Sequence, residues 1–182
     1  MHNKIILVLL LASCNLFAIS SCKKSGAAAL PKETQNGANT FGCLINGAVF
    51  IPHDVYSLSI IPGLISGYST TTKKFSIFAS EPPNGNANEL QRSVYIEIIN
   101  PHIGGNNFDI NYINYAQITF DQSFQLEKVF QTSDSLPGIV NIIRLDTSSK
   151  IISGTFSFSA AQRDSSNNLI QVSDGRFDVT YK

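Results

Sequence analysis

From residue 41 onward the apolar residues recur at every second position, and the breaks between them are rich in Asn, Gly, Asp and Pro. Alternation of this kind predicts β-strands with one face toward a core. We therefore expect an all-β chain: a single antiparallel β-sandwich or partly closed β-barrel domain of about 8–11 strands. Between two terminal hairpins, the expected strands lie near residues 56–61, 64–69, 74–80, 93–100, 108–113, 116–121, 126–131, 138–146 and 151–161.

An Asn-Gly pair at residues 46–47 marks the first hairpin. This pair is favoured in a two-residue type I′ turn, which fixes the register of the two strands it joins. Such a turn pairs Ile45 with Ala48, and Cys43 with Phe50. Both faces of the hairpin are apolar, so we expect it to be buried on two sides or to lie at a barrel seam.

An Asp-Gly pair at residues 174–175 predicts a second hairpin near the end of the chain. The expected core face carries Ile170, Val172, Phe177, Val179 and Tyr181, and the expected water-facing side carries Gln171, Ser173, Arg176, Asp178 and Thr180. The clearest predicted loops are residues 81–88 and 102–107. Loops of this kind often carry binding residues.

The first 22 residues have the order of an export signal. Lys4 precedes an apolar run over residues 5–19 that is too short to span a bilayer comfortably, and the run closes on Ser-Ser-Cys22. This order predicts a lipoprotein signal peptide over residues 1–21 and acylation of Cys22. Cys14 is an alternative acylation site because it follows Leu-Ala-Ser, and a secretory signal without lipid is a further alternative.

Residues 22–40 are small and polar, without a periodic apolar face. They predict a lipidated flexible tether with a reach of about 25 Å, followed by the all-β domain over residues 41–182. The membrane would be contacted through the N-terminal lipid. We therefore expect a cell-envelope protein anchored to the outer membrane, on its periplasmic face or at the cell surface.

The charge balance argues against nucleic acid as a partner. The chain has 13 Lys and Arg against 13 Asp and Glu, without the basic stripe that a nucleic-acid binder needs. With Cys22 acylated, Cys43 is left without a disulfide partner. Its apolar neighbours favour a buried side chain over a reactive thiol.

No residue pattern predicts catalysis, a metal or a cofactor. His53 and His102 lack the spacing of zinc ligands, and the Asn- and Asp-rich segments 106–109 and 164–168 fit turns better than a calcium loop. The chain contains no nucleophile elbow, zinc-protease helix or phosphate-binding loop. Carboxylate pairs leave a glycosidase open as a third and more distant possibility, because their separation in space is not visible in the sequence.

Five tyrosines, Tyr56, Tyr68, Tyr95, Tyr112 and Tyr115, are candidates for a sugar-stacking platform. Tyrosine is also a common strand residue that buries its ring, and the absence of tryptophan weakens the sugar-binding interpretation. The weak ligand-binding candidates are therefore Tyr68, Tyr115 and His102.

Three segments carry a family resemblance: residues 30–47 (LPKETQNGANTFGCLING), 154–158 (GTFSF) and 174–181 (DGRFDVTY). Together they resemble a family of small uncharacterised lipoproteins of the Bacteroidota type. The resemblance implies an envelope β-domain of unknown function and carries over no catalytic or ligand residues. Surface display in that family is often associated with acidic residues after the acylated cysteine, whereas Lys23 and Lys24 stand here.

Two functions from different classes follow from the sequence. The first is a non-enzymatic binding or accessory module for a glycan, a peptide or another small ligand. The second is a structural or protein-docking envelope component without a small-molecule ligand. An open concave face would favour the first, and a uniformly convex polar surface would favour the second.

Overall fold

The computed structural model describes residues 26–56, 60–81, 91–108, 114–121, 128–133, 135–136, 138–163 and 165–182. A short 3₁₀ helix, η1 (Gly26–Ala29), precedes the strands. The strands are β1 (Thr40–Ile45), β2 (Ala48–Phe50), β3 (Val55–Tyr56), β4 (Ile60–Ile61), β5 (Leu64–Ser69), β6 (Lys74–Glu81), β7 (Gln91–Ile99), β8 (Gly104–Asn107), β9 (Asn114–Asp121), β10 (Lys128–Gln131), β11 (Gly138–Asp146), β12 (Ile151–Gln162) and β13 (Ser165–Thr180).

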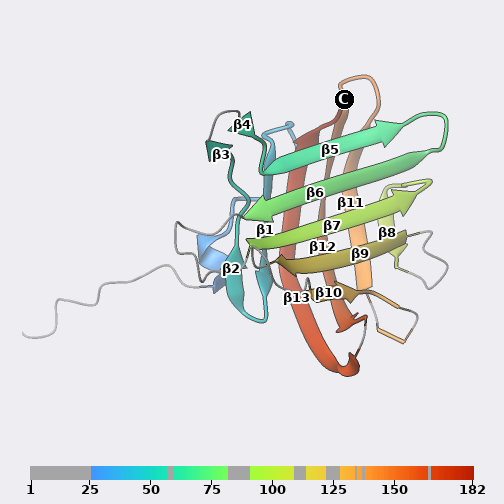
Figure 1. Ribbon diagram of the computed structural model, residues 1–182. Coiled ribbons are helices and arrows are strands. Elements are labelled where there is room, and N and C mark those ends of the chain that lie inside the picture. Colours follow the sequence, from blue (N-terminus) through green and yellow to red (C-terminus); the bar gives the residue numbers. More distant parts are fainter. Residues whose placement is uncertain are drawn as a thin grey trace, which may run out of the picture.

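Eleven of the described strands form one antiparallel sheet, in the order β2-β1-β13-β12-β10-β9-β7-β6-β5. Strand β11 branches from β12 and carries β8 on its other side, while β3 and β4 pair with each other. The sheet curls into a half-barrel (Figure 1). The expected all-β antiparallel class is therefore confirmed.

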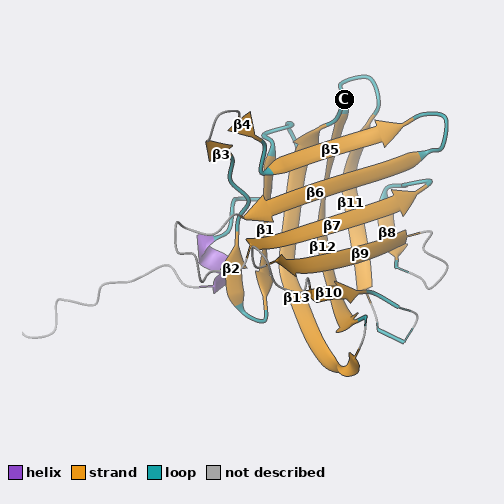
Figure 2. Ribbon diagram, viewed as in Figure 1, coloured by secondary structure: helices purple, strands orange, loops and turns teal. Residues whose placement is uncertain are grey.

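The curled sheet folds over itself into two layers. Strands β5, β6, β7 and β9, which we call the front layer, cross β1, β13, β12 and β11, the back layer (Figures 1 and 2). The layers separate at β12, which pairs with β11 along residues 151–158 but meets β10 only through residues 161–162. This short junction leaves one face of each layer turned toward the other.

The core fills the space between the layers. Its alternating strand positions are fully buried, including Phe75 and Ile77 of β6 and Ile96 of β7. The rings of Phe75 and Phe177 lie 5.8 Å apart across the layers. Each such side chain contributes roughly 1.5–3 kcal/mol when it leaves water, so alternation along the strands directly stabilises the two-layer arrangement.

The edge of the front layer approaches the end of the back layer. The ring centroids of Tyr68 on β5 and Tyr181 lie 5.3 Å apart. The Ser66 hydroxyl donates a 3.1 Å hydrogen bond to the carbonyl of Thr180. These contacts join the edge strand β5 to the C-terminal end of β13, and no strand ladder links the two among the described residues.

The first predicted hairpin is confirmed. Cys43 pairs with Phe50 and Ile45 with Ala48, in the register expected for a two-residue turn. The turn residues Asn46 and Gly47 have φ values of 48° and 78°, as a type I′ turn requires. Five consecutive residues of β1 are buried, so the hairpin strand is covered on both faces as expected.

The predicted hairpin at residues 174–175 is wrong. Strand β13 continues through this point, and its register with β12 shifts between Phe156 and Phe158. The Asp-Gly pair instead forms a β-bulge, with Asp174 at a φ of 52°. A bulge shifts the alternation by one residue as a turn does, so the expected core residues of this strand are nevertheless buried.

The predicted tether is wrong for residues 30–40, which pack against the β-domain. Leu30 is 7% exposed, and the Asp178 carboxylate binds Thr34, Asn36, Gly37 and Ala38. Asp178 is therefore 1% exposed, in contrast to the water-facing position expected for it. The segment has little apolar surface, and polar contacts with distant residues hold it in place.

The middle of the chain matches the sequence-based expectation in part. Strands β5 and β11 have the predicted bounds, but the loop expected over residues 102–107 contains β8, which pairs with β11. Most of the strand expected over 108–113 and most of the loop expected over 81–88 lie outside the described residues. Strand β8 has no hydrophobic alternation, so its sequence resembles a loop.

Candidate functional site

The structure does not gather the predicted ligand-binding residues into one site. Tyr68 turns toward the core and packs on Tyr181. His102 is exposed, in the loop between β7 and β8. Tyr115 belongs to β9, but its side chain lies outside the described part, as do those of Tyr56 and Tyr112. The position of Tyr68 therefore does not support a tyrosine platform, and His102 lies apart from Tyr68.

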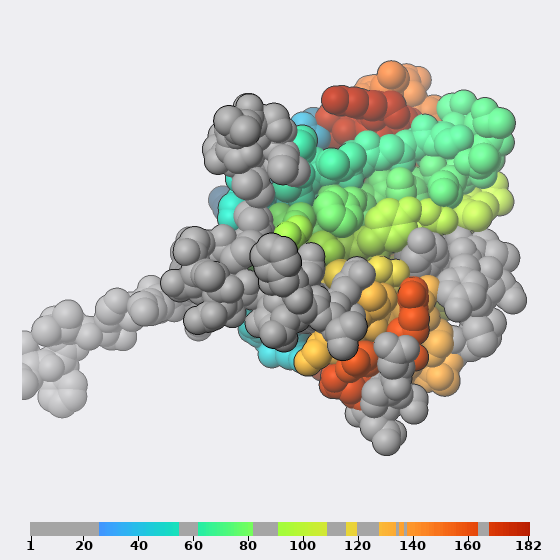
Figure 3. Space-filling view, viewed as in Figure 1, coloured from blue at the N-terminus to red at the C-terminus, as the bar shows by residue number. Residues whose placement is uncertain are grey.

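Tyr95 is the remaining tyrosine of the proposed platform. Its hydroxyl donates to the Glu97 carboxylate, and Glu97 also forms an ion pair with Lys74 at 3.2 Å. Tyr95 and Glu97 alternate with the buried Ile96 and Ile98 and therefore point to the outer face of the front layer. No other described segment passes across β5 and β6 on this face (Figure 3). The polar groups on this face therefore bind one another.

The acylation candidates Cys22 and Cys14 lie outside the described residues. Among the residues that are described, no helix is long and apolar enough to cross a membrane. The described residues also contain no group of three or more His, Cys, Asp or Glu side chains that could hold a metal ion.

Cys43 is enclosed in the core and is 0% exposed. Burial raises the pKa of its thiol to about 12. We expect a thiol reagent at pH 8 to leave Cys43 unmodified in the native protein and to react with it fully in denaturant, because only the thiolate attacks. Absorbance of released thionitrobenzoate measures this reaction, with the A48C variant as a control that adds an exposed thiol. Rapid native labelling of Cys43 would contradict its assignment as a core residue.

A groove runs over the outer face of the back layer, on β11, β12 and β13, and we call it the sheet groove. Its first half has a volume of about 290 Å³ and is lined by Glu33, Ile139, Asn141, Thr155, Phe156, Ser157, Asp174, Gly175 and Arg176. Its second half has a volume of about 370 Å³ and is lined by Asn107, Gly138, Ile139, Ser157, Phe158, Ser159, Gln171, Val172 and Ser173. Ile139 and Ser157 belong to both halves, so the halves adjoin at these two residues.

The sheet groove offers uncommitted polar groups on a rigid floor. Among the described residues, the side chains of Asn141, Thr155, Ser157 and Ser159 make no hydrogen bond to another protein group. Ile139 adds an apolar contact at the junction and is 40% exposed. Donors, acceptors and one apolar anchor along a strand-lined groove suit an extended polar ligand.

Strand alternation and the bulge together build this groove. Thr155, Ser157 and Ser159 point outward because Phe156 and Phe158 between them point into the core. Asp174 and its neighbours reach the same face because the bulge displaces β13 locally. The alternation of β12 predicts its wet face, but no sequence signal shows that β8, β11 and β13 extend the groove on either side of it.

A third and larger hollow, of 450 Å³, lies at the seam between β5 and the C-terminal end of β13. Apart from Lys182, its polar side chains are already bonded. Asn39 accepts hydrogen bonds from the amide and hydroxyl of Thr180, at 2.9 and 2.8 Å, and Asp54 accepts one from the amide of Gly63 at 2.9 Å. The seam therefore offers a ligand fewer partners than the sheet groove.

The N-terminal segment is held beside the sheet groove by Asp178, an arrangement that we call the Asp178 clamp. The carboxylate accepts hydrogen bonds from the Thr34 hydroxyl at 2.7 Å and from the amides of Asn36, Gly37 and Ala38 at 3.0, 2.8 and 3.1 Å. Burial would raise the pKa of Asp178, but these hydrogen bonds outweigh it and hold the pKa below its ordinary value. The clamp therefore contains an ionised carboxylate.

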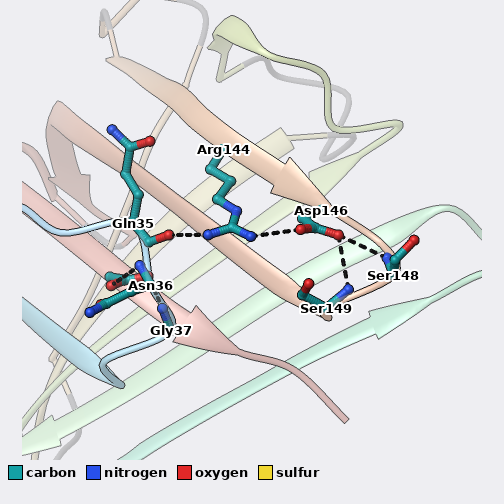
Figure 4. A network of polar contacts seen from close by, with 8 residues as sticks. Gln35, Asn36, Gly37, Arg144, Asp146, Ser148 and Ser149 are labelled. Carbon is teal, nitrogen blue, oxygen red and sulfur yellow. Dashed lines mark hydrogen bonds and ion pairs between the residues drawn. The ribbon is translucent and has the colours of Figure 1, made fainter.

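A second polar network holds the same segment through Gln35 (Figure 4). The Arg144 guanidinium donates to the carbonyl of Gln35 and to Asp146, the latter at 2.6 Å. Asp146 also accepts the amides of Ser148 and Ser149, at 3.0 and 2.9 Å. The amide hydrogen bond from Ser149 and the contact with Arg144 lower the pKa of Asp146. The turn after β11 thus positions Arg144 to hold the segment.

Comparisons of this chain with protein-family models, with curated proteins and with solved structures give no match. The geometry of the sheet groove and of the N-terminal segment is therefore the basis for a functional proposal.

Proposed function

We propose that this protein is a lipid-anchored, non-catalytic binding module of the cell envelope that holds an extended peptide segment in its sheet groove. The observation that carries this proposal is the row of unbonded side chains, Asn141, Thr155, Ser157 and Ser159, along a continuous groove. Amide and hydroxyl groups of this kind match the donors and acceptors of an extended backbone.

Two features favour a peptide over a glycan. The described lining contains no exposed aromatic ring on which a sugar could stack, because Phe156 and Phe158 are each 3% exposed. In addition, the chain's own segment 34–38 lies against this layer through hydrogen bonds from its backbone amides. The same sheet face already holds one stretch of polypeptide in this way.

The membrane anchor is proposed from the sequence, with Cys22 as the acylated residue.

The charge of the groove favours some peptides over others, because its described lining carries two acidic residues, Glu33 and Asp174, and one cation, Arg176. The Arg176 side chain donates to the carbonyls of Asp174 and Pro31, at 3.2 and 3.4 Å. A basic or neutral peptide therefore fits the groove better than an acidic one.

Selection from a random peptide library tests this function. The bait is residues 22–182 with Cys22→Ser, and the comparison is the same protein carrying Ser157→Tyr, which fills the junction of the two halves. We expect enriched peptides to bind the bait and to lose at least tenfold in affinity with S157Y, as measured by fluorescence anisotropy. The matched control S76Y, on the outer face of the front layer, should leave the affinity unchanged.

Other outcomes would redirect the assignment. Equal binding to the bait and to S157Y would place the peptide site outside the sheet groove. No enriched peptide, together with a rise in melting temperature on adding a glycan, would replace the peptide with a sugar ligand. No response to either class would favour the structural or protein-docking role.

A further inference from the structure

We propose that the face of the domain carrying η1 and the β1–β2 hairpin lies against the headgroup layer of the membrane. This inference rests on the proposed acylation of Cys22. It follows from the way in which the chain beyond that residue is fixed to the domain, which leaves only a short link to the lipid.

Among the described residues, which begin at Gly26, the first buried one is Leu30, which is 7% exposed. Leu30 and Pro31 lie over Gly42 of β1, where a side-chain carbon on Gly42 would come within 2.7 Å of Pro31 and 3.3 Å of Leu30. From there the segment continues to the Asp178 clamp. The stretch from residue 30 to residue 40 therefore belongs to the folded domain and cannot lengthen the link.

The remaining link is short compared with the domain. Seven residues separate Cys22 from Leu30, and four of them form η1. The eight residue-to-residue steps from Cys22 to Leu30, four of them extended and four in a 3₁₀ helix, span at most about 22 Å. The headgroup layer occupies about 5–8 Å of that length. A domain of this size has a radius of gyration of about 15 Å, so it cannot turn freely on such a link.

The attachment point determines which face is held toward the membrane. Helix η1 packs against β1 and β2. In Figure 1, η1 and β2 lie at one end of the molecule and the turn joining β5 to β6 lies at the opposite end. Lys32 is exposed next to the attachment point, and Lys23 and Lys24 follow Cys22 in the sequence. Anionic phospholipid headgroups would attract these cations and favour the same orientation.

Quenching of fluorophores by headgroup-labelled lipid measures this orientation. The full-length acylated protein is reconstituted in phosphatidylethanolamine and phosphatidylglycerol vesicles that contain a lipid with a nitroxide on its headgroup. One fluorophore is attached through A48C, near η1, and another through T71C, in the distant turn. We expect quenching at position 48 to exceed that at position 71 at least threefold. The native Cys43 is buried and does not compete for the label.

A longer link provides the control. Inserting 12 Gly and Ser residues between Ser25 and Gly26 leaves every described contact in place, and we expect it to bring the two quenching values together. Equal quenching at both positions without the insertion would overturn the orientation while leaving the anchor intact. Failure of Cys22 to incorporate an alkyne-labelled fatty acid, together with recovery of the protein in the soluble fraction, would overturn the anchor and with it this inference.

Discussion

Replacing Asp178 by alanine is expected to lower the free energy of unfolding by about 3 kcal/mol and to release residues 34–39 from the domain. The carboxylate is 1% exposed and accepts four hydrogen bonds from this segment. Hydrogen bonds to a charged group contribute about 1.5–3 kcal/mol, and loss of the acceptor leaves amide donors without a partner. Urea denaturation measures the first effect, and amide hydrogen exchange of residues 34–39 measures the second.

The pH dependence of stability identifies the charge as the cause. Because the pKa of Asp178 is lowered in the folded protein, the unfolded chain binds the proton more readily. The stabilisation by this carboxylate is therefore complete above about pH 4, the ordinary pKa of aspartate, and is lost as the pH falls through the folded value. D178A should lack this part of the acid dependence.

Asp174 supplies the matched control for this substitution. It lies four residues earlier on the same strand, is exposed, and makes no hydrogen bond with the segment over residues 34–39 among the described contacts. D174A should lower the free energy of unfolding by no more than about 1 kcal/mol, because alanine adopts the positive φ of this position less readily than aspartate. A similar loss in D178A and D174A, or unchanged amide exchange in D178A, would show that the clamp does not hold the segment.

Replacing Gly175 by alanine is expected to destabilise the protein by about 2–3 kcal/mol, which is the cost of overpacking a filled core. A side-chain carbon at this position would lie 2.5 Å from two atoms of the Phe156 ring. That ring cannot withdraw, because it packs against Phe41 at a centroid distance of 5.1 Å and against Phe177 at 6.4 Å. Chemical denaturation of G175A against the unmodified protein measures this cost.

Two further variants attribute that cost to the ring. Gly67 lies in β5 with only the Ser76 hydroxyl within 4 Å, at 3.8 Å, so G67A should cost less than about 1 kcal/mol. Adding Phe156→Leu to G175A should give a double variant less destabilised than the sum of the single variants, because the smaller side chain removes the clash. Strict additivity would indicate that Gly175 is required by the backbone of the bulge instead.

The hydrophobic pattern determined the fold class because each strand reports its own buried face. The alternation in β6, β7 and β12 predicts their core residues from local sequence alone, without knowledge of a partner strand. The register of the first hairpin is equally local, since the Asn-Gly pair supplies the positive φ values that its turn requires. The candidate groove could be predicted only as a wet face on β12.

The Asp-Gly pair at residues 174–175 shows where local information ends. Glycine after an aspartate with positive φ is compatible with a turn and with a bulge, and both shift the alternation by one residue. The two alternatives therefore bury the same side chains on either side of the pair. Only the pairing of β13 with both β12 and β1 determined that the strand continues.

By itself, the sequence determined the all-β class, the buried faces, the first hairpin and the proposal of a lipid anchor at Cys22. The tertiary structure alone showed that residues 30–40 belong to the domain and that a groove lies over the back layer. The sequence could not predict these features because the residues that form them lie far apart along the chain. The Asp178 clamp joins residues about 140 positions apart through polar groups. Such groups have no hydrophobic periodicity, so their partners become visible only when the sheet brings them together.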